Sequence, residues 1–157
     1  MTNRVHVAHH PVHPMLVPFP IGLWVFSLAS DVAFRLGAGP VWDTIAFWTM
    51  VGGIIGALAA ANPGFIDFQS LNDPRTWRIA VVHLSLNLTI VVLYLVNLWV
   101  RTYGMPGDAL PITLSAVAVG LLLVSGWFGG TLVYERGVAV APEPDVIITT
   151  QGRGRAA

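Results

Sequence analysis

Long apolar runs, separated by short polar segments, dominate the 157-residue chain. Four of them, at 18–36, 44–61, 79–100 and 111–134, approach or exceed the roughly 20 helical residues that cross a hydrocarbon core of about 30 Å. None alternates as a strand would, and backbone polar groups in lipid must bond within their own segment. The pattern predicts an all-α fold, an integral membrane four-helix bundle over residues 1–140, followed by a flexible tail at 141–157.

Prolines mark the start of the first helix. Pro18 and Pro20 lack a backbone N–H, so they suit the first turn, where that donor has no intrahelical partner, and they predict a start near Val17. Residues before proline avoid the helical region, which predicts that His10 and His13 lie in an extended lead-in. The N-terminus has no small-residue cleavage motif, so we expect the first span to be retained.

Caps and helix breakers delimit the other spans. Asp43 and Thr44 offer an N-cap for the second helix, which we expect to stop or kink at the Asn-Pro-Gly stretch at 62–64. Asp73 followed by Pro74 predicts that the third helix starts before the membrane. The pattern indicates neither a second domain nor a convincing internal repeat.

Charge and composition narrow the class of protein. Four spans place both termini on one side, and the positive-inside rule predicts that this side is cytoplasmic, because six of the eight basic residues fall there. Only 10% of the residues are charged, 55% are hydrophobic and the net charge is zero, so nothing argues for nucleic acid. The absence of cysteine excludes thiolate-ligated centres held by this chain alone. The expected partner is the lipid bilayer.

Glycines four residues apart recur in two of the predicted helices, as Gly52 with Gly56 and as Gly126 with Gly130. Small residues at this spacing allow close backbone approach, which drives helix association in membranes. They indicate packing within the bundle. The alternatives are room for a flat cofactor or for a partner helix, which includes a second copy of the chain and hence a homo-oligomer.

Polar residues inside the spans are energetically costly and therefore informative. In the third helix, steps of three, four or seven residues place one polar stripe on a single face, formed by His83, Asn87, Tyr94, Asn97 and Arg101. Such a stripe sets the register of a bundle through hydrogen bonds. Asp31 and Arg35 are four apart, which predicts that they pair within the first helix. The alternative is a proton or ion pathway, with the candidates Asp31, Arg35, Asn97 and Arg101.

Histidines gather at the end of the bundle where the chain begins. By topology His10, His13 and His83 share one membrane face, and neutral imidazole binds zinc, copper and haem iron. We therefore predict a site for a transition metal ion or a haem, with His13 and His83 as ligands and His10 as an alternate ligand. Three residues are expected around these ligands: Asp67, Asn87 and Tyr134. The alternative roles are hydrogen bonds to helix-end carbonyls and proton transfer.

Four stretches, taken in order, resemble a family of bacterial and archaeal four-helix predicted membrane proteins of unknown function. They are HPVHPMLVPFPIGLW at 10–24, GFIDF at 64–68, HLSLN at 83–87 and GWFGGTLVYERGVAV at 126–140. The resemblance covers nearly the whole chain and implies a prokaryotic plasma membrane. After LVY the chain has Glu135 and Arg136 where many relatives have a histidine, which leaves His10, His13 and His83 as candidate ligands.

Some members of that family look fused to, or encoded beside, Rieske-type or cytochrome domains. The resemblance thus implies electron transfer within a larger assembly, with a haem b as cofactor and redox subunits as partners. Two other classes stay open: a membrane scaffold or accessory subunit without chemistry, and the proton or ion pathway. A hydrolytic enzyme is not predicted, because no serine lies in a recognisable nucleophile motif.

Overall fold

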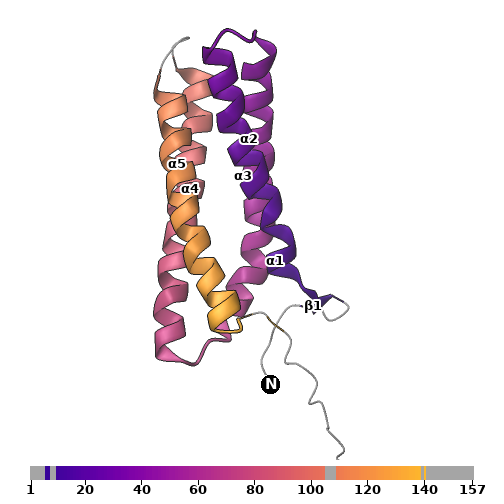
Figure 1. The fold of residues 1–157 in the computed structure, drawn as a ribbon, viewed down its shortest axis with the longest axis vertical. Helices are drawn as coiled ribbons and strands as arrows, with labels where there is room; N and C mark the ends of the chain where they lie inside the picture. The colour runs from indigo at the N-terminus through magenta and orange to yellow at the C-terminus, as the bar shows by residue number, and fades with distance from the viewer. Residues whose placement is uncertain (1–5, 8–9, 105–108, 139, 141–157) are drawn as a thin grey trace, which may run out of the picture.

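The computed structural model describes residues 6–7, 10–104, 109–138 and 140, and it confirms a bundle of four long helices (Figure 1). In order, the elements are β1 (His6–Val7), β2 (His10–Pro11), α1 (Val12–Leu16), α2 (Pro18–Arg35), α3 (Val41–Gln69), α4 (Pro74–Tyr103), α5 (Leu110–Gly130) and the π-helix η1 (Thr131–Glu135). The two strands pair antiparallel. Four helical segments, of which α1 with α2 is the first and α5 with η1 the last, are long and apolar enough to cross a membrane.

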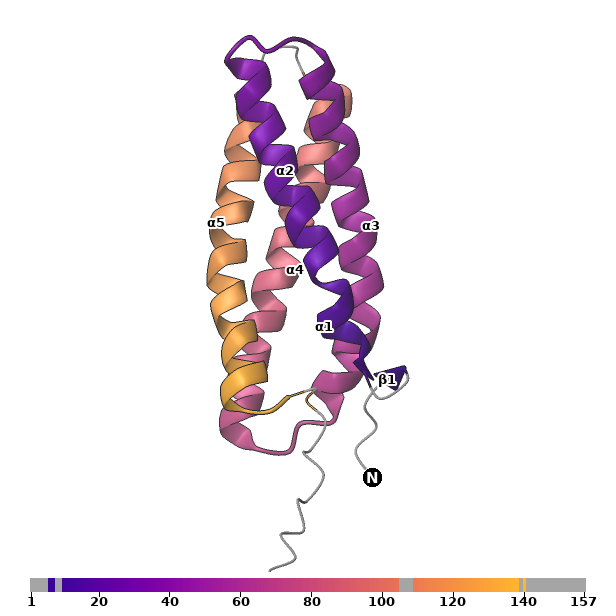
Figure 2. The same ribbon diagram turned by 45° about the vertical axis from the view of Figure 1, so that its right-hand side comes forward.

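Two helical hairpins build the bundle (Figures 1 and 2). Most interhelical contacts are between α2 and α3 and between α4 and α5, while α2 also meets α5 and α3 also meets α4. Both hairpins begin at the same end of the bundle, where the chain enters α1 and leaves η1. We call this end, with His13 and His83, the histidine end. The opposite end, with Asp31 and Arg101, is the arginine end.

The first span begins earlier than the sequence predicts. Helical structure starts at Val12 and breaks at Val17, between α1 and α2, so His13 is helical and the prediction of an extended conformation is wrong for it. Pro14 is tolerated because it is the third helical residue, where a backbone N–H would have no intrahelical acceptor. The extended conformation is confirmed for the backbone of His10, which belongs to β2.

The second span, α3, is longer than predicted at both ends. It begins at Val41 with no side-chain cap, so Asp43 lies in its first turn and does not cap it. It also continues through Pro63 to Gln69, past the expected stop. Pro63 cannot donate to the carbonyl four residues earlier, which loosens this turn. The helix nevertheless continues, because α1 packs against α3 and tertiary packing outweighs one lost hydrogen bond.

The third span starts as predicted. The carboxylate of Asp73 accepts hydrogen bonds from the hydroxyl of Thr76 at 2.7 Å and from its backbone N–H at 2.9 Å, and Pro74 is the first helical residue. These bonds favour the ionised form and lower the pKa of Asp73. With 30 residues, α4 is about 45 Å long, so its ends extend beyond a hydrocarbon core of about 30 Å.

An aromatic pair lies at the centre of the core, between the two ends. The rings of Trp24 and Tyr94 stack with their centroids 4.4 Å apart, and the two residues are 2% and 0% exposed. Trp24 lies on Gly53, where a Cβ would overlap the indole ring. The remaining buried members of this cluster are Met50, Ile54, Ile90, Ala118 and Leu122. A largely apolar layer therefore separates the polar side chains of the two ends.

The two predicted glycine pairs differ in role. A Cβ at Gly52 or at Gly56 would meet side chains of α2 at 3.3 Å, so this pair lets α3 approach α2 closely. A Cβ at Gly126 would have no atom within 4 Å, and one at Gly130 would meet only the side chain four residues later. In the described part of the chain, the second pair therefore packs against no other helix. Its use by a partner chain stays a prediction.

Candidate functional site

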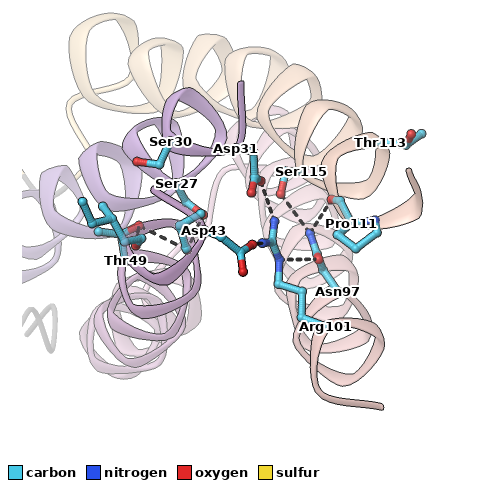
Figure 3. A network of polar contacts seen from close by, with 12 residues as sticks. Ser27, Ser30, Asp31, Asp43, Thr49, Asn97, Arg101, Pro111, Thr113 and Ser115 are labelled. Atoms are coloured by element: carbon cyan, nitrogen blue, oxygen red, sulfur yellow. Dashed lines mark hydrogen bonds and ion pairs between the residues drawn. The ribbon is translucent and has the colours of Figure 1, made fainter. Parts of the chain in front are cut away.

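At the arginine end, one guanidinium joins the two hairpins (Figure 3). Arg101 of α4 forms an ion pair with Asp31 of α2 at 2.5 Å and a longer one with Asp43 of α3 at 3.6 Å. The side chains of Arg101 and Asp31 are only 8% and 6% exposed, whereas that of Asp43 is 57% exposed. We call Asp31, Asp43, Asn97, Arg101 and Ser115 the arginine cluster.

Asn97 extends the arginine cluster to the fourth helix. Its Oδ1 accepts a hydrogen bond from Nε of Arg101 at 3.1 Å. Its Nδ2 donates to the carbonyl of Pro111 and to Oγ of Ser115, both at 2.8 Å, as Figure 3 shows. One connected network thus ties all four helices together, which fixes their register as the polar stripe of α4 predicts.

The structure changes the predicted pairing of Asp31. Its ion pair is with Arg101, 70 residues later in the chain, and not the expected intrahelical pair with Arg35. The four-residue spacing favours a local pair, but it cannot reveal a guanidinium that another helix brings closer. Asp31, Asn97 and Arg101, three of the four candidates for an ion pathway, belong to one bonded network. Their role in ion movement stays a prediction.

At the histidine end, the ring of His13 is held against α3. Its Nδ1 lies 2.8 Å from the carbonyl oxygen of Ala60. The ring also packs on Gly64, where a Cβ would come within 2.6 Å of Nδ1. Both contacts follow from the Asn-Pro-Gly stretch, because Pro63 loosens the helix at this turn and the glycine beside it leaves room for the ring.

The ring of His83 is held against α5 in the same manner. Its Nδ1 lies 2.9 Å from the carbonyl oxygen of Ser125, and a Cβ at Gly129 would come within 3.0 Å of the ring. Asn87 lies one turn further along α4, beside the ring. Its Nδ2 is 2.8 Å from the carbonyl oxygen of His83, 2.8 Å from Oγ of Ser125 and 3.2 Å from Nε2 of His83.

Hydrogen-bond chemistry assigns the tautomer of both rings. A carbonyl oxygen only accepts, so Nδ1 carries the proton in His13 and in His83, and Nε2 has the lone pair. The amide of Asn87 has two N–H groups and two acceptors at 2.8 Å, so its contact with Nε2 of His83 is the third and longest. Nε2 of each histidine is therefore the nitrogen that can bind a metal.

Comparison with protein-family models matches residues 9–142 to the family described as "Predicted membrane protein (DUF2231)". The chain belongs to this family. The match includes all four spans and both polar ends, so this DUF2231 protein is a multi-pass membrane protein, and the resemblance to a membrane family of unknown function is confirmed. Neither the curated proteins nor the solved structures that were compared with the chain gave a match.

The other predicted site residues of this DUF2231 protein are not all brought together. His13 and His83 lie near enough for their charges to interact, and Asp67 is buried in the last turns of α3 at the same end. Tyr134 is 89% exposed on η1, so the prediction that it lies beside the ligands is wrong. The side chain of His10 lies outside the described residues. Among those described, no group of three or more His, Cys, Asp or Glu could hold a metal ion.

Sequence reasoning misses the groups that hold the two rings. The acceptors are main-chain carbonyls of Ala60 and Ser125, which no side-chain pattern reveals. Gly64 is visible only as a helix breaker, and Gly129 lies between the two glycines whose spacing stands out. The signal that could have found them is a glycine four residues after a small residue on the helix that packs against each histidine.

Proposed function

We propose that this DUF2231 protein binds a redox-active metal cofactor between its two hairpins and carries electrons within a larger membrane assembly. One observation supports the proposal most directly. His13 from the first hairpin and His83 from the second each direct Nδ1 to a main-chain carbonyl, at 2.8 and 2.9 Å. Histidines that ligate metals usually donate their second ring nitrogen in this way, which fixes the tautomer and the orientation of the ligating nitrogen.

The donor set fits a haem better than a bare metal ion. In the described part of the chain, no third His, Cys, Asp or Glu joins the two histidines, whereas protein zinc sites use three or four protein ligands. A haem takes two axial ligands from the protein, because the porphyrin supplies the other four nitrogens. Two neutral imidazoles from separate helices meet that need. A bound haem would supply one-electron redox chemistry.

The remaining residues at the histidine end would hold the ligands in place. The carbonyls of Ala60 and Ser125 keep Nδ1 of each ring protonated, so both rings stay neutral with Nε2 available. Asn87 bonds to Oγ of Ser125 and thereby fixes α4 against α5 beside the ring of His83. The largely apolar layer around the aromatic pair separates the ligands from the charges of the arginine end.

An optical spectrum of protein purified in mild detergent tests the proposal. We expect a Soret band in the air-oxidised sample that shifts on reduction with dithionite, together with stoichiometric iron in elemental analysis. His13→Ala and His83→Ala should each remove most of the bound haem. His6→Ala, the same substitution at a histidine outside the candidate ligands, should leave haem content unchanged.

Two results would overturn the proposal. One is a featureless spectrum without stoichiometric metal, from a preparation shown to retain its cofactors. The other is a haem band that is unchanged in the double variant His13→Ala/His83→Ala. Either result would favour a membrane scaffold, in which the hydrogen bonds of the two rings serve only to join helices.

A further inference from the structure

The contacts of the two histidines repeat each other position by position. His13 donates to the carbonyl of Ala60 and packs on the glycine four residues later, Gly64. His83 donates to the carbonyl of Ser125 and also packs on the glycine four residues later, Gly129. His83 follows His13 by 70 residues, and both contacts on α5 follow those on α3 by 65 residues.

The same offsets relate residues along the whole length of the bundle. Adding 70 takes Ser27 to Asn97, and adding 65 takes the carbonyl of Ala46, to which Ser27 donates, to that of Pro111, to which Asn97 donates. The buried residues of α2 and α4 correspond likewise. Four pairs share this offset of 70: Pro20 with Ile90, Trp24 with Tyr94, Ser27 with Asn97, and Ser30 with Val100.

These correspondences define an internal two-fold repeat, which the sequence pattern did not reveal. The repeat exchanges α2 with α4 and α3 with α5, and therefore also exchanges the two contacts between hairpins, α2 with α5 and α3 with α4. Both hairpins start at the same end, so the pseudo-symmetry axis runs along the bundle (Figure 2). Equivalent residues meet across it: Trp24 stacks on Tyr94, and Asp31 pairs with Arg101.

Most equivalent contact positions now carry different residues. Trp faces Tyr, Ser corresponds to Asn, and Asp to Arg. Among the contacts described above, residue type is the same in both hairpins only at His13 and His83 and at Gly64 and Gly129. The two halves have diverged in how they pack, while each retains a histidine and the glycine on which its ring lies.

We propose that His13 and His83 are equivalent ligands of a single site on the pseudo-symmetry axis, with Gly64 and Gly129 as its two positioning residues. This inference rests on the proposed function for the identity of the ligand, a planar metalloporphyrin with two axial positions. Two equivalent imidazoles suit such a ligand, because its two axial sites are themselves equivalent. The glycines act through the rings, since a Cβ would come within 2.6 Å of His13 and 3.0 Å of His83 and would displace each ring.

Two double-mutant cycles test the positioning role without requiring any cofactor. Gly64→Ala should lower the Tm of the detergent-solubilised protein, but should have little effect when His13→Ala has already removed the ring. Gly129→Ala should behave in the same way with His83→Ala. Gly126→Ala is the matched control on α5, because its Cβ meets no atom within 4 Å, and it should leave Tm unchanged or slightly higher. A loss of Tm that is equal with and without the histidine would overturn the inference.

Titration with haem, read from the Soret band, tests the equivalence of the two ligands. Gly64→Ala and Gly129→Ala should each weaken haem binding by a similar factor, on the order of tenfold, and Gly126→Ala should not. An effect at one glycine and none at the other would overturn the equivalence. If the wild type binds no haem, the proposed function fails, while the two cycles still decide whether each glycine positions its histidine.

Discussion

The two ends of the bundle fill equivalent positions in opposite ways. At the arginine end the pair is Asp31 and Arg101, an acid and a base that satisfy each other. At the histidine end the pair is His13 and His83, two identical rings whose Nδ1 protons are both directed to carbonyls. Two lone pairs cannot bond to each other. The first pair is complete by itself, whereas the second becomes complete only with a metal or a proton.

This difference separates stability from ligand binding along one axis. Residues of opposite charge at equivalent positions join the hairpins and hold four helices in register. Identical residues at equivalent positions leave a donor pair for a shared ligand. We therefore expect substitutions at the arginine end to affect unfolding most, and substitutions at the histidine end to affect cofactor content most.

Arg101→Ala should have the largest effect on stability. It removes the guanidinium from Asp31, whose side chain is only 6% exposed, and from Oδ1 of Asn97. Removing one partner of a buried ion pair costs about 3–5 kcal/mol, because the other charge is left desolvated. Unfolding in detergent, followed by circular dichroism, would measure this loss. A loss no larger than that of His13→Ala would contradict the contrast between the two ends.

Exchanging the two charges sharpens the same comparison. In the double variant Asp31→Arg/Arg101→Asp, an ion pair can form again, because the two positions face each other across the axis. We expect it to recover much of the stability that Asp31→Arg alone removes. Recovery should be incomplete, because Asp43 would then lie beside a carboxylate at 101. If the double variant were no more stable than Asp31→Arg alone, the equivalence of the positions would be wrong.

Gly53→Ala probes the apolar layer between the two ends and should have the next largest effect. A Cβ would overlap the indole ring of Trp24, and overpacking of a core costs about 1–3 kcal/mol. Gly52→Ala is the matched control, because its Cβ would meet only the flexible end of Leu23 at 3.3 Å. Thermal unfolding of both variants would measure the difference. Equal losses would contradict the tight seating of Trp24.

Removal of either histidine from cofactor-free protein should have a smaller effect. His13→Ala and His83→Ala each remove a hydrogen bond to a carbonyl, which is worth about 1 kcal/mol, and the two losses should be alike. Unfolding of haem-depleted protein would measure them. A loss as large as that of Arg101→Ala would assign the histidine end a structural role comparable with that of the arginine end.

Local chemistry explains which parts of the fold the sequence predicts. The four spans and the cap at Asp73 follow from run length and N-cap preference, and both are confirmed. The ends of α1 and α3 are misplaced, because Pro14 and Pro63 are read as boundaries although both lie inside helices. Position within the first turn decides the first case, and packing against α1 decides the second.

The candidate site is readable only where side chains differ from their apolar surroundings. His13, His83 and Asn87 stand out for that reason, but the carbonyls that hold the rings belong to the backbone. The repeat escapes notice because equivalent positions differ in residue type, as Trp24 and Tyr94 do, and because the second hairpin is five residues shorter. Only three-dimensional contacts align the two halves.

Asp73 offers the smallest effect, at an exposed charge of the histidine end. The hydroxyl and the backbone N–H of Thr76 lower the pKa of this carboxyl in the folded protein below its ordinary value of 3.8. Its ionised form therefore adds stability above pH 3.8, and this contribution disappears as the pH falls through the lower folded value. Asp73→Asn removes the charge but keeps a capping side chain.

The difference in Tm between the wild type and Asp73→Asn, measured from neutral pH into strong acid, tests this dependence. We expect a small positive difference at neutral pH that vanishes once Asp73 is protonated, because a protonated carboxyl accepts the bonds of Thr76 more weakly. A difference that persists in acid would mean that the shape of the cap, not its charge, starts α4. In that case ionised carboxylates would contribute to stability at the arginine end through Asp31, but not at the histidine end through Asp73.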